Sequence, residues 1–127
     1  MEKKKILVVD DEVELCRLLH IGLTASGVFQ VFTTHDGETG RMLAIRENPD
    51  LILLDIVMPG MSGGELAEEL RENPLTASIP IIFMTAVISA KEEPKNGACP
   101  GGRMIIAKPL NLKSLLAQIQ AVLAKGS

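Results

Sequence analysis

Short apolar runs alternate with stretches of helical spacing along the whole chain. The apolar runs are residues 6–9, 28–33, 51–54, 80–84 and 104–107. Most are apolar at consecutive positions, which is typical of strands buried on both faces of a parallel sheet. The run at 28–33 mixes apolar and polar positions and predicts an edge strand. Strands alternating with helices predict an α/β fold: a doubly wound, five-stranded parallel sheet with right-handed crossovers and helices on both faces.

Capping signals mark where the helices begin. Ser62 and Glu65 have the spacing of a capping box, in which each side chain accepts a hydrogen bond from the other residue's amide. Asp11 and Glu14 have the same spacing and predict a second capping box at the first helix. The other helix starts are predicted at single capping residues, Asp36 and Asn111.

The segment 86–102 interrupts this alternation. Ser89 and Glu92 are placed to begin a helix, but Pro94 falls where the helix interior would be. Several glycine and proline residues follow closely. We therefore expect the fourth helix to be short or irregular.

Composition narrows the class of protein. The 127 residues are 46% hydrophobic and 23% charged, which is typical of one globular domain with a hydrophobic core. A net charge of −3 and the absence of Trp and Tyr argue against a nucleic-acid surface. The apolar runs are too short for a membrane span or a signal peptide, so we expect a cytoplasmic protein without a membrane partner. Cys16 and Cys99 have no metal-ligand spacing.

Polar side chains stand where four of the predicted strands end. Parallel strands place their carboxyl ends on one edge of the sheet, where α/β proteins bind ligands, so we expect these side chains to converge. Carboxylate oxygens suit Mg²⁺, lysine can neutralise a phosphoryl group, and aspartate can accept one as an aspartyl-phosphate. The residues are Asp10, Asp11, Asp55, Thr85 and Lys108.

Each of these residues also has a structural explanation when taken alone. An acidic pair often begins a helix, an aspartate often caps a turn, and a lysine before proline is often a solvated charge. Their joint appearance on one predicted edge is much harder to attribute to chance. Clustering of this kind favours a functional site.

The chain resembles the receiver domain of two-component response regulators, of the single-domain chemotaxis type. The resemblance covers essentially the whole chain, residues 1–127, as one domain. It implies a flavodoxin-like sheet with strand order 2-1-3-4-5. The motifs that carry it are Ile6-Leu7-Val8-Val9-Asp10-Asp11-Glu12, Asp55-Ile56-Val57-Met58-Pro59-Gly60, Thr85-Ala86 and Lys108-Pro109.

The resemblance also implies a role for each site residue. Asp55 would take a phosphoryl group from a phosphohistidine on a sensor histidine kinase or a histidine phosphotransfer protein. Asp10 and Asp11 would hold Mg²⁺ together with Asp55 and the backbone carbonyl of Val57. Lys108 would contact the phosphoryl oxygens. Thr85 would move toward them as the switch. The resemblance implies a signalling domain rather than an enzyme. It does not identify the downstream protein, and it leaves open whether the domain forms a homodimer.

Two departures from the family bear on how the signal is read and how long it lasts. Family members usually carry Tyr or Phe three residues before the lysine, whereas this chain has Ile105. We therefore expect the phosphorylated state to be read by a different surface, or through ordering of loop 86–102. Val57 and Val87 follow Asp55 and Thr85 by two residues and offer no group to orient an attacking water, which predicts slow dephosphorylation.

Three alternatives remain at this point. A phosphatase or phosphotransferase of the haloacid dehalogenase type also uses an aspartate at a strand end, but its second acid would stand where this chain has Val57. A nucleotide-binding Rossmann-like module would need a glycine-rich loop after the first strand, where this chain has acids. A receiver fold kept only for protein contacts would not need the complete set of polar residues.

Overall fold

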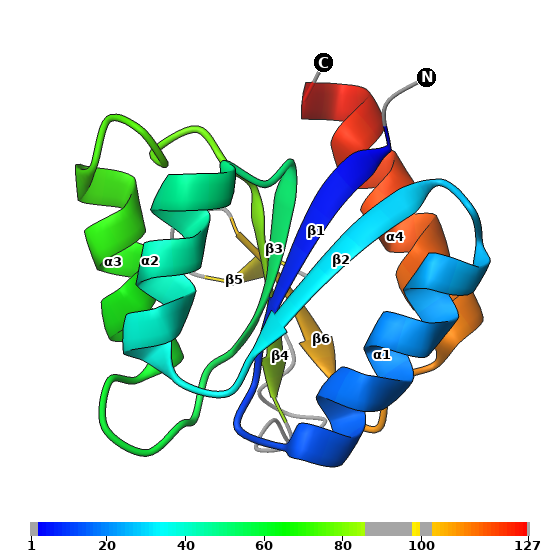
Figure 1. Ribbon diagram of the computed structural model, residues 1–127, viewed down its shortest axis with the longest axis horizontal. Helices are drawn as coiled ribbons and strands as arrows, with labels where there is room; N and C mark the ends of the chain where they lie inside the picture. The colour runs from blue at the N-terminus through cyan, green and yellow to red at the C-terminus, as the bar shows by residue number, and fades with distance from the viewer. Residues whose placement is uncertain (1–2, 86–97, 100–102, 127) are drawn as a thin grey trace.

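The computed structural model describes residues 3–85, 98–99 and 103–126 as a parallel sheet covered by helices on both faces (Figure 1). The strands are β1 Lys4–Val9, β2 Phe29–Thr34, β3 Leu51–Asp55, β4 Ile81–Thr85, β5 Ala98–Cys99 and β6 Arg103–Ala107. The helices are α1 Val13–Ala25, α2 Gly37–Glu47, α3 Gly63–Glu72 and α4 Leu112–Gly126.

The strand order is β2-β1-β3-β4-β6-β5. The first five strands in this order pair in parallel, which confirms the predicted order 2-1-3-4-5 with β6 as the fifth parallel strand. Strand β2 pairs with β1 and lies at the edge of the sheet, as predicted. The predicted five-stranded parallel sheet is confirmed, and the two-residue β5, which was not predicted, adds an antiparallel pairing to β6. The predicted fourth helix falls in residues 86–97 and lies outside the described residues.

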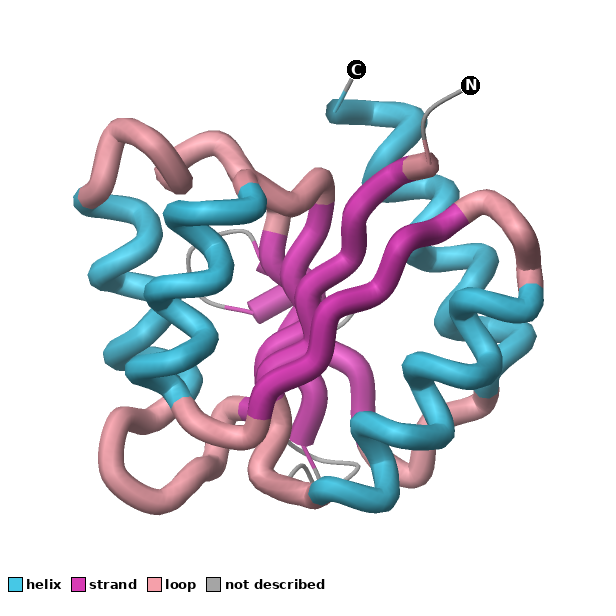
Figure 2. The backbone as a smooth tube through the Cα atoms, viewed as in Figure 1, coloured by secondary structure: helices cyan, strands magenta, loops and turns pink. Residues whose placement is uncertain are grey.

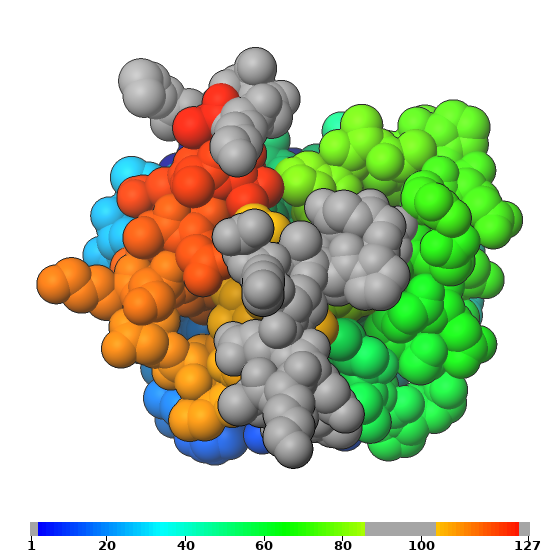
Figure 3. All heavy atoms as spheres, turned by 180° about the vertical axis from the view of Figure 1, so that it is seen from behind, coloured from blue at the N-terminus to red at the C-terminus, as the bar shows by residue number. Residues whose placement is uncertain are grey.

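Among the described residues, two helices cover each face of the sheet. Helices α2 and α3 lie on one face and α1 and α4 on the other (Figures 1 and 2). Seen from behind, the orange-to-red surface of α4 and the green surface that includes α3 lie on opposite sides of the molecule (Figure 3). The sheet is thereby buried on both faces, which is why its central strands are apolar at consecutive positions.

Each face has its own hydrophobic core, and successive strand residues alternate between the two. On β1, Ile6 and Val8 belong to the cluster on the α1/α4 side, and Leu7 and Val9 to the cluster on the α2/α3 side. Strand β3 alternates in the same way, with all five of its residues buried. This alternation also fixes the face to which the polar residue at each strand end belongs.

Three of the four predicted helix caps are confirmed. The side chains of Asp36 and Asn111 accept hydrogen bonds from amides in the first turns of α2 and α4, and Ser62 with Glu65 forms the predicted capping box of α3. The predicted Asp11–Glu14 capping box is wrong. Glu12 is the N-cap of α1 and makes no side-chain cap hydrogen bond. Its amide donates instead to a different acid, Asp10.

Candidate acidic site at the carboxyl edge of the sheet

Three carboxylates meet at the carboxyl ends of β1 and β3. Asp10 directly follows β1, Asp11 comes next, and Asp55 is the last residue of β3. Because β1 and β3 are neighbouring parallel strands, their ends lie side by side. One oxygen from each of the three carboxylates lies within 4.8 Å of the others. Asp10 and Asp55 are buried, at 0% and 4% exposure, whereas Asp11 is exposed.

The chain around Asp55 holds this residue in place. Its strand, β3, pairs with β1 on one side and with β4 on the other. The Val57 amide donates a hydrogen bond to Asp55 Oδ1 over 3.3 Å. The Gly63 amide donates to the carbonyl of Ile56 over 2.9 Å, so the loop after β3 folds back against the strand end. Asp55 therefore stands on a fixed support at the centre of the sheet edge.

Asp10 is fixed by a different set of contacts. Its Oδ1 accepts a hydrogen bond from the Glu12 amide over 2.8 Å. Its backbone carbonyl accepts one from the Cys16 thiol at 3.3 Å and lies 3.3 Å from His35 Nδ1. Its Oδ2 is buried and accepts no hydrogen bond from the described residues, although Lys108 lies close to it.

Lys108 brings a single positive charge to the three acids. It follows β6 directly, and its Nζ lies 2.8 Å from Asp10 Oδ2 and 3.6 Å from Asp55 Oδ2. The same Nζ donates a hydrogen bond to Glu12 Oε1 over 2.6 Å. Sequence reasoning missed Glu12 as a member of this site and treated it as part of a helix start; its place beside Asp10 and Asp11 was the signal.

Thr85 lies at the same edge but continues a different face of the sheet. It is the last residue of β4, is 2% exposed, and its carbonyl accepts a hydrogen bond from the Lys108 amide over 2.8 Å. Successive side chains of β4 point to opposite faces of the sheet: Phe83 belongs to the cluster on the α2/α3 side and Met84 to the cluster on the α1/α4 side. By this alternation, Thr85 lies on the α2/α3 side. By the same alternation along β3, Asp55 lies on the α1/α4 side. The predicted residues thus share one edge, where the three acids cluster and Lys108 contacts Asp10 and Asp55.

Burial and crowding perturb the acid–base properties of the site. Burial, followed by the charge of Asp10, raises the pKa of Asp55 to about 6. Burial alone would lower the pKa of Lys108, but its contacts with Asp10 and Glu12 outweigh that effect and raise the pKa. Burial also raises the pKa of the Cys16 thiol to about 11, so this cysteine stays protonated. The site therefore carries excess negative charge beside one permanent cation.

The donor set fits a hard divalent cation. All three clustered side chains offer oxygen, the ligand type that Mg²⁺ prefers. One buried oxygen of this set, Asp10 Oδ2, has the ion pair with Lys108 Nζ at 2.8 Å as its close contact among the described residues. The raised pKa of Asp55 reflects its burial and then the charge of Asp10, and a bound cation would offset both effects.

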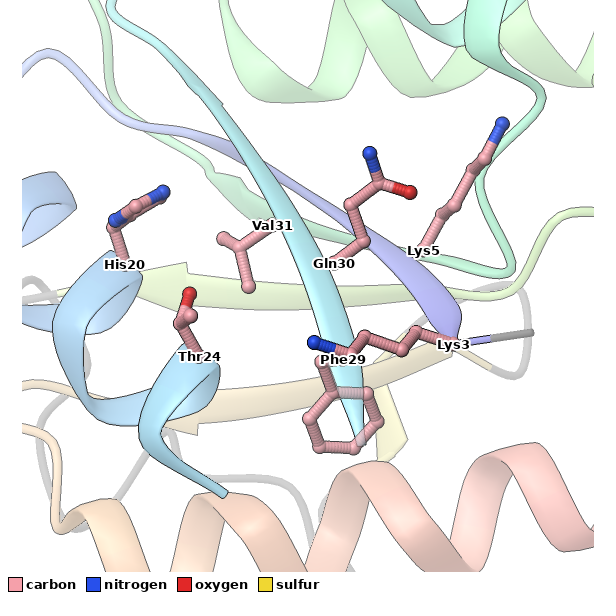
Figure 4. A pocket seen from close by; sticks show the side chains of 7 residues that line it. All are labelled: Lys3, Lys5, His20, Thr24, Phe29, Gln30 and Val31. Atoms are coloured by element: carbon pink, nitrogen blue, oxygen red, sulfur yellow. The ribbon is translucent and has the colours of Figure 1, made fainter. Parts of the chain in front are cut away.

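One cavity lies away from these acids. It measures about 530 Å³ and is lined by residues near the amino ends of β1 and β2 and by two residues of α1 (Figure 4). The acids stand at the carboxyl ends of the strands, so this cavity is not part of their site. Lys5, one of its lining residues, already contacts Glu47 over 3.6 Å. Separately, none of the helices among the described residues is long and apolar enough to cross a membrane.

Comparison with known proteins agrees with this geometry. The family model of the response regulator receiver domain matches residues 6–120. The response regulator PleD of Caulobacter vibrioides is 36% identical over 118 residues, which are 93% of this chain and 26% of the relative. The phosphate regulon regulatory protein PhoB of Pseudomonas aeruginosa is 36% identical over 126 residues, which are 98% of this chain and 54% of the relative. The chain thus spans between about a quarter and about half of the length of these relatives.

Solved structures extend the match to the fold. A response regulator from Desulfuromonas acetoxidans has a TM-score of 0.83 and 32% identity, over 95% of this chain and 97% of that one. These similarities do not favour the haloacid dehalogenase or Rossmann-like alternatives. They identify a signalling domain that accepts a phosphoryl group. The chain belongs to the family of response regulator receiver domains.

Proposed function

We propose that Asp55 is the phosphoryl acceptor of this receiver. The phosphoryl donor is a phosphohistidine on a sensor histidine kinase or on a histidine phosphotransfer protein. Asp10, Asp11, Asp55 and the backbone carbonyl of Val57 hold Mg²⁺. The whole of residues 1–127 acts as one cytoplasmic receiver domain that signals through a change of conformation.

The observation that carries this proposal is the position of Asp55 among the charged groups. It lies on β3, which has a paired strand on each side, and its Oδ2 is 3.6 Å from Lys108 Nζ. Asp10 is fully buried, and Asp11 stands on the loop beyond the strand end. Of the three acids, Asp55 combines a rigid support, a nearby cation and a side chain that is 6% exposed, compared with 0% for Asp10, and these features favour it as the acceptor.

The proposed reaction moves one phosphoryl group between two side chains. A carboxylate oxygen of Asp55 attacks phosphorus, a P–O bond forms, and the P–N bond to the donor histidine breaks. The bonding electrons stay on the histidine nitrogen, which is left as neutral imidazole after proton exchange with water. Lys108 lies close enough to neutralise charge on the transferred oxygens. When bound, Mg²⁺ supplies further neutralisation of those oxygens.

Thr85 is the switch residue in this proposal. Its buried hydroxyl stands at the end of the strand next to β3, on the face toward α2 and α3. A phosphoryl group on Asp55 would offer new acceptor oxygens to that hydroxyl. On strand β6, Ile105 occupies the position where family members usually carry an aromatic residue, and it pairs with Phe83 of β4. The usual aromatic partner of the switch is therefore replaced by an aliphatic one. We infer that the output surface differs from the usual one.

Intact mass after incubation with acetyl phosphate and Mg²⁺ tests the proposal. The wild-type chain should gain one phosphoryl group, and Asp55→Asn should gain none. Asp50→Asn is the matched control, because Asp50 lies just before the amino end of β3 and accepts a hydrogen bond from the Lys5 amide that asparagine can also accept. This control should be phosphorylated like the wild type. Equal labelling of all three proteins would contradict Asp55 as acceptor, and labelling of none would favour a receiver fold used only for protein contacts.

A further inference from the structure

The ammonium of Lys108 is hydrogen-bonded to an acid outside the three-carboxylate cluster. It donates to Glu12 Oε1 over 2.6 Å and lies 2.8 Å from Asp10 Oδ2. The distance to Asp55 Oδ2 is 3.6 Å, beyond hydrogen-bond range. The cation is therefore held toward the β1–α1 connection and away from the proposed acceptor.

Glu12 is suited to hold this cation only temporarily. Its side chain is 58% exposed, whereas those of Asp10 and Asp55 are 0% and 6% exposed. Ion pairs with an exposed partner are weak and readily exchanged for water or for another anion. At the same time, the backbone of Glu12 is fixed, because it is the N-cap of α1 and its amide donates to Asp10 Oδ1. The carboxylate is thus kept near Lys108 without being locked to it.

Glu12 also stands apart from the proposed metal ligands. The clustered carboxylates are Asp10, Asp11 and Asp55, and Glu12 is not among them. Its closest charged contact among the described residues is the ammonium of Lys108. This acid therefore acts on the site through the lysine.

We propose that Glu12 is a positioning residue that competes with a phosphoryl group on Asp55 for the ammonium of Lys108. This inference rests on the function proposed above. A phosphoryl group on Asp55 brings additional negative oxygens to the region beside Lys108 Nζ. The ammonium lies 3.6 Å from Asp55 Oδ2, so it must shift toward Asp55 to bond them. That shift weakens its hydrogen bond to Glu12, which is the weaker of its two short contacts because it is exposed. The competition lowers the affinity of the site for the phosphoryl group.

Binding of beryllofluoride, which forms a phosphoryl-like adduct on aspartate, provides the test. Calorimetric titrations in saturating Mg²⁺ would compare the wild type, Glu12→Gln and Glu14→Gln. Glu12→Gln keeps the shape of the side chain and removes its charge, and it should bind about threefold more tightly, the size expected for release of an exposed ion pair. Glu14→Gln removes the same charge from an exposed acid that forms no ion pair with Lys108 among the described contacts. It should bind like the wild type.

The outcomes separate this inference from the proposed function. If the wild type does not bind beryllofluoride, or if Asp55→Asn binds it equally well, the proposed function fails. If the wild type binds through Asp55 and Glu12→Gln binds equally or more weakly, the role of Glu12 is wrong. An equal gain in Glu14→Gln would also overturn it, since the effect would then be one of general charge.

A second measurement needs no phosphoryl analogue or metal. Urea unfolding in EDTA would compare Glu12→Gln, Lys108→Met and the double variant. Their effects on the free energy of unfolding should be non-additive, because both substitutions remove one shared contact. The pair Glu14→Gln and Lys108→Met should be additive. Additivity in the Glu12 pair would show that the contact is absent in solution and would overturn the proposal.

Discussion

Gly63 packs directly against the backbone carbonyl of Asp55. A Cβ built on Gly63 would lie 2.1 Å from that oxygen and 2.8 Å from the Cα of Ile56. Both neighbours are backbone atoms and cannot rotate away as a side-chain tip would. The start of α3 is therefore in contact with the strand end that carries the proposed acceptor, and only glycine fits between them.

Gly63→Ala should destabilise the protein and impair phosphorylation together. Relief of the overlap requires the loop or the end of β3 to shift, at a cost of about 1–3 kcal/mol in the free energy of unfolding. Gly64→Ala is the matched control, since a Cβ there would have only Ser62 Oγ nearby, at 3.9 Å. Helix propensity favours alanine in the control, so its stability should be equal or higher. Urea unfolding and the rate of labelling by acetyl phosphate would check both variants, and equal behaviour would contradict this prediction.

The raised pKa of Asp55 predicts a pH-dependent loss of stability in the metal-free protein. With a pKa of about 6 in the folded chain and 3.8 as its ordinary value, Asp55 holds its proton longer when folded. The folded state thus binds more protons between about pH 4 and about pH 6, and the free energy of unfolding falls as pH rises through that window. The loss from this group should be about 3 kcal/mol.

Asp55→Asn isolates this contribution. In EDTA it should be more stable than the wild type by about 3 kcal/mol at neutral pH, and the difference should disappear below about pH 4. Unfolding curves measured across this range provide the check. A variant that is less stable than the wild type at neutral pH would mean that the Lys108 contact outweighs burial and the charge of Asp10.

Lys108→Met should leave Asp10 buried without its counter-charge. Asp10 is 0% exposed and its Oδ2 lies 2.8 Å from Lys108 Nζ. Removing one partner of such a buried pair lowers the free energy of unfolding by about 3 kcal/mol. Added Mg²⁺ should restore part of the loss, because a bound cation replaces the missing positive charge. Lys113→Met, at an exposed position of α4, should change little. A loss that Mg²⁺ leaves untouched would argue against metal binding at Asp10.

Mg²⁺ should raise the stability of the wild type more than that of Asp11→Asn. A ligand that binds only the folded state stabilises it by about 2.7 kcal/mol at a concentration of one hundred times its dissociation constant. Asp11 is the exposed member of the cluster, so its substitution removes a proposed ligand without disturbing the core. Melting temperatures in EDTA and in excess Mg²⁺ would show the difference. Equal shifts in both proteins would exclude Asp11 as a ligand.

Phosphorylated protein should lose its phosphoryl group slowly. Val57 is 56% exposed beside Asp55, and its apolar side chain has no group to orient an attacking water. We expect the label to persist for minutes or longer, and Val57→Asn to shorten its lifetime by supplying a polar group. The decay of intact-mass label after removal of acetyl phosphate measures this. Decay of the wild type within seconds would contradict the prediction.

The sequence was sufficient to predict the parallel sheet, its order and the edge where the polar residues meet. Buried strands such as β3 can be predicted from the sequence because both of their faces are covered and carry apolar residues. Parallel strands place Asp10, Asp55 and Lys108 on one edge of the sheet, however far apart they are in the sequence. The two-residue β5 was not predictable, because a strand that short has no periodicity.

Details within the site depended on contacts that only the folded chain defines. The hydrogen bond from Lys108 to Glu12 joins residues 96 positions apart, so the contact itself is defined only once the chain is folded. The first helix cap was mispredicted for a similar reason. Asp10 accepts from the Glu12 amide, so the turn is stabilised from outside the helix, and Asp11 is left exposed.

The alternation of β3 between two cores also determines how the protein tolerates insertions and deletions. Loss of a single residue between 51 and 54 would exchange the side chains that face α1 and α4 with those that face α2 and α3. It would also turn Asp55 to the face opposite Lys108. One missing codon in this strand should therefore be more damaging than a conservative substitution at any of its positions, whereas a change of length in the loop at residues 75–79 leaves the strand register intact.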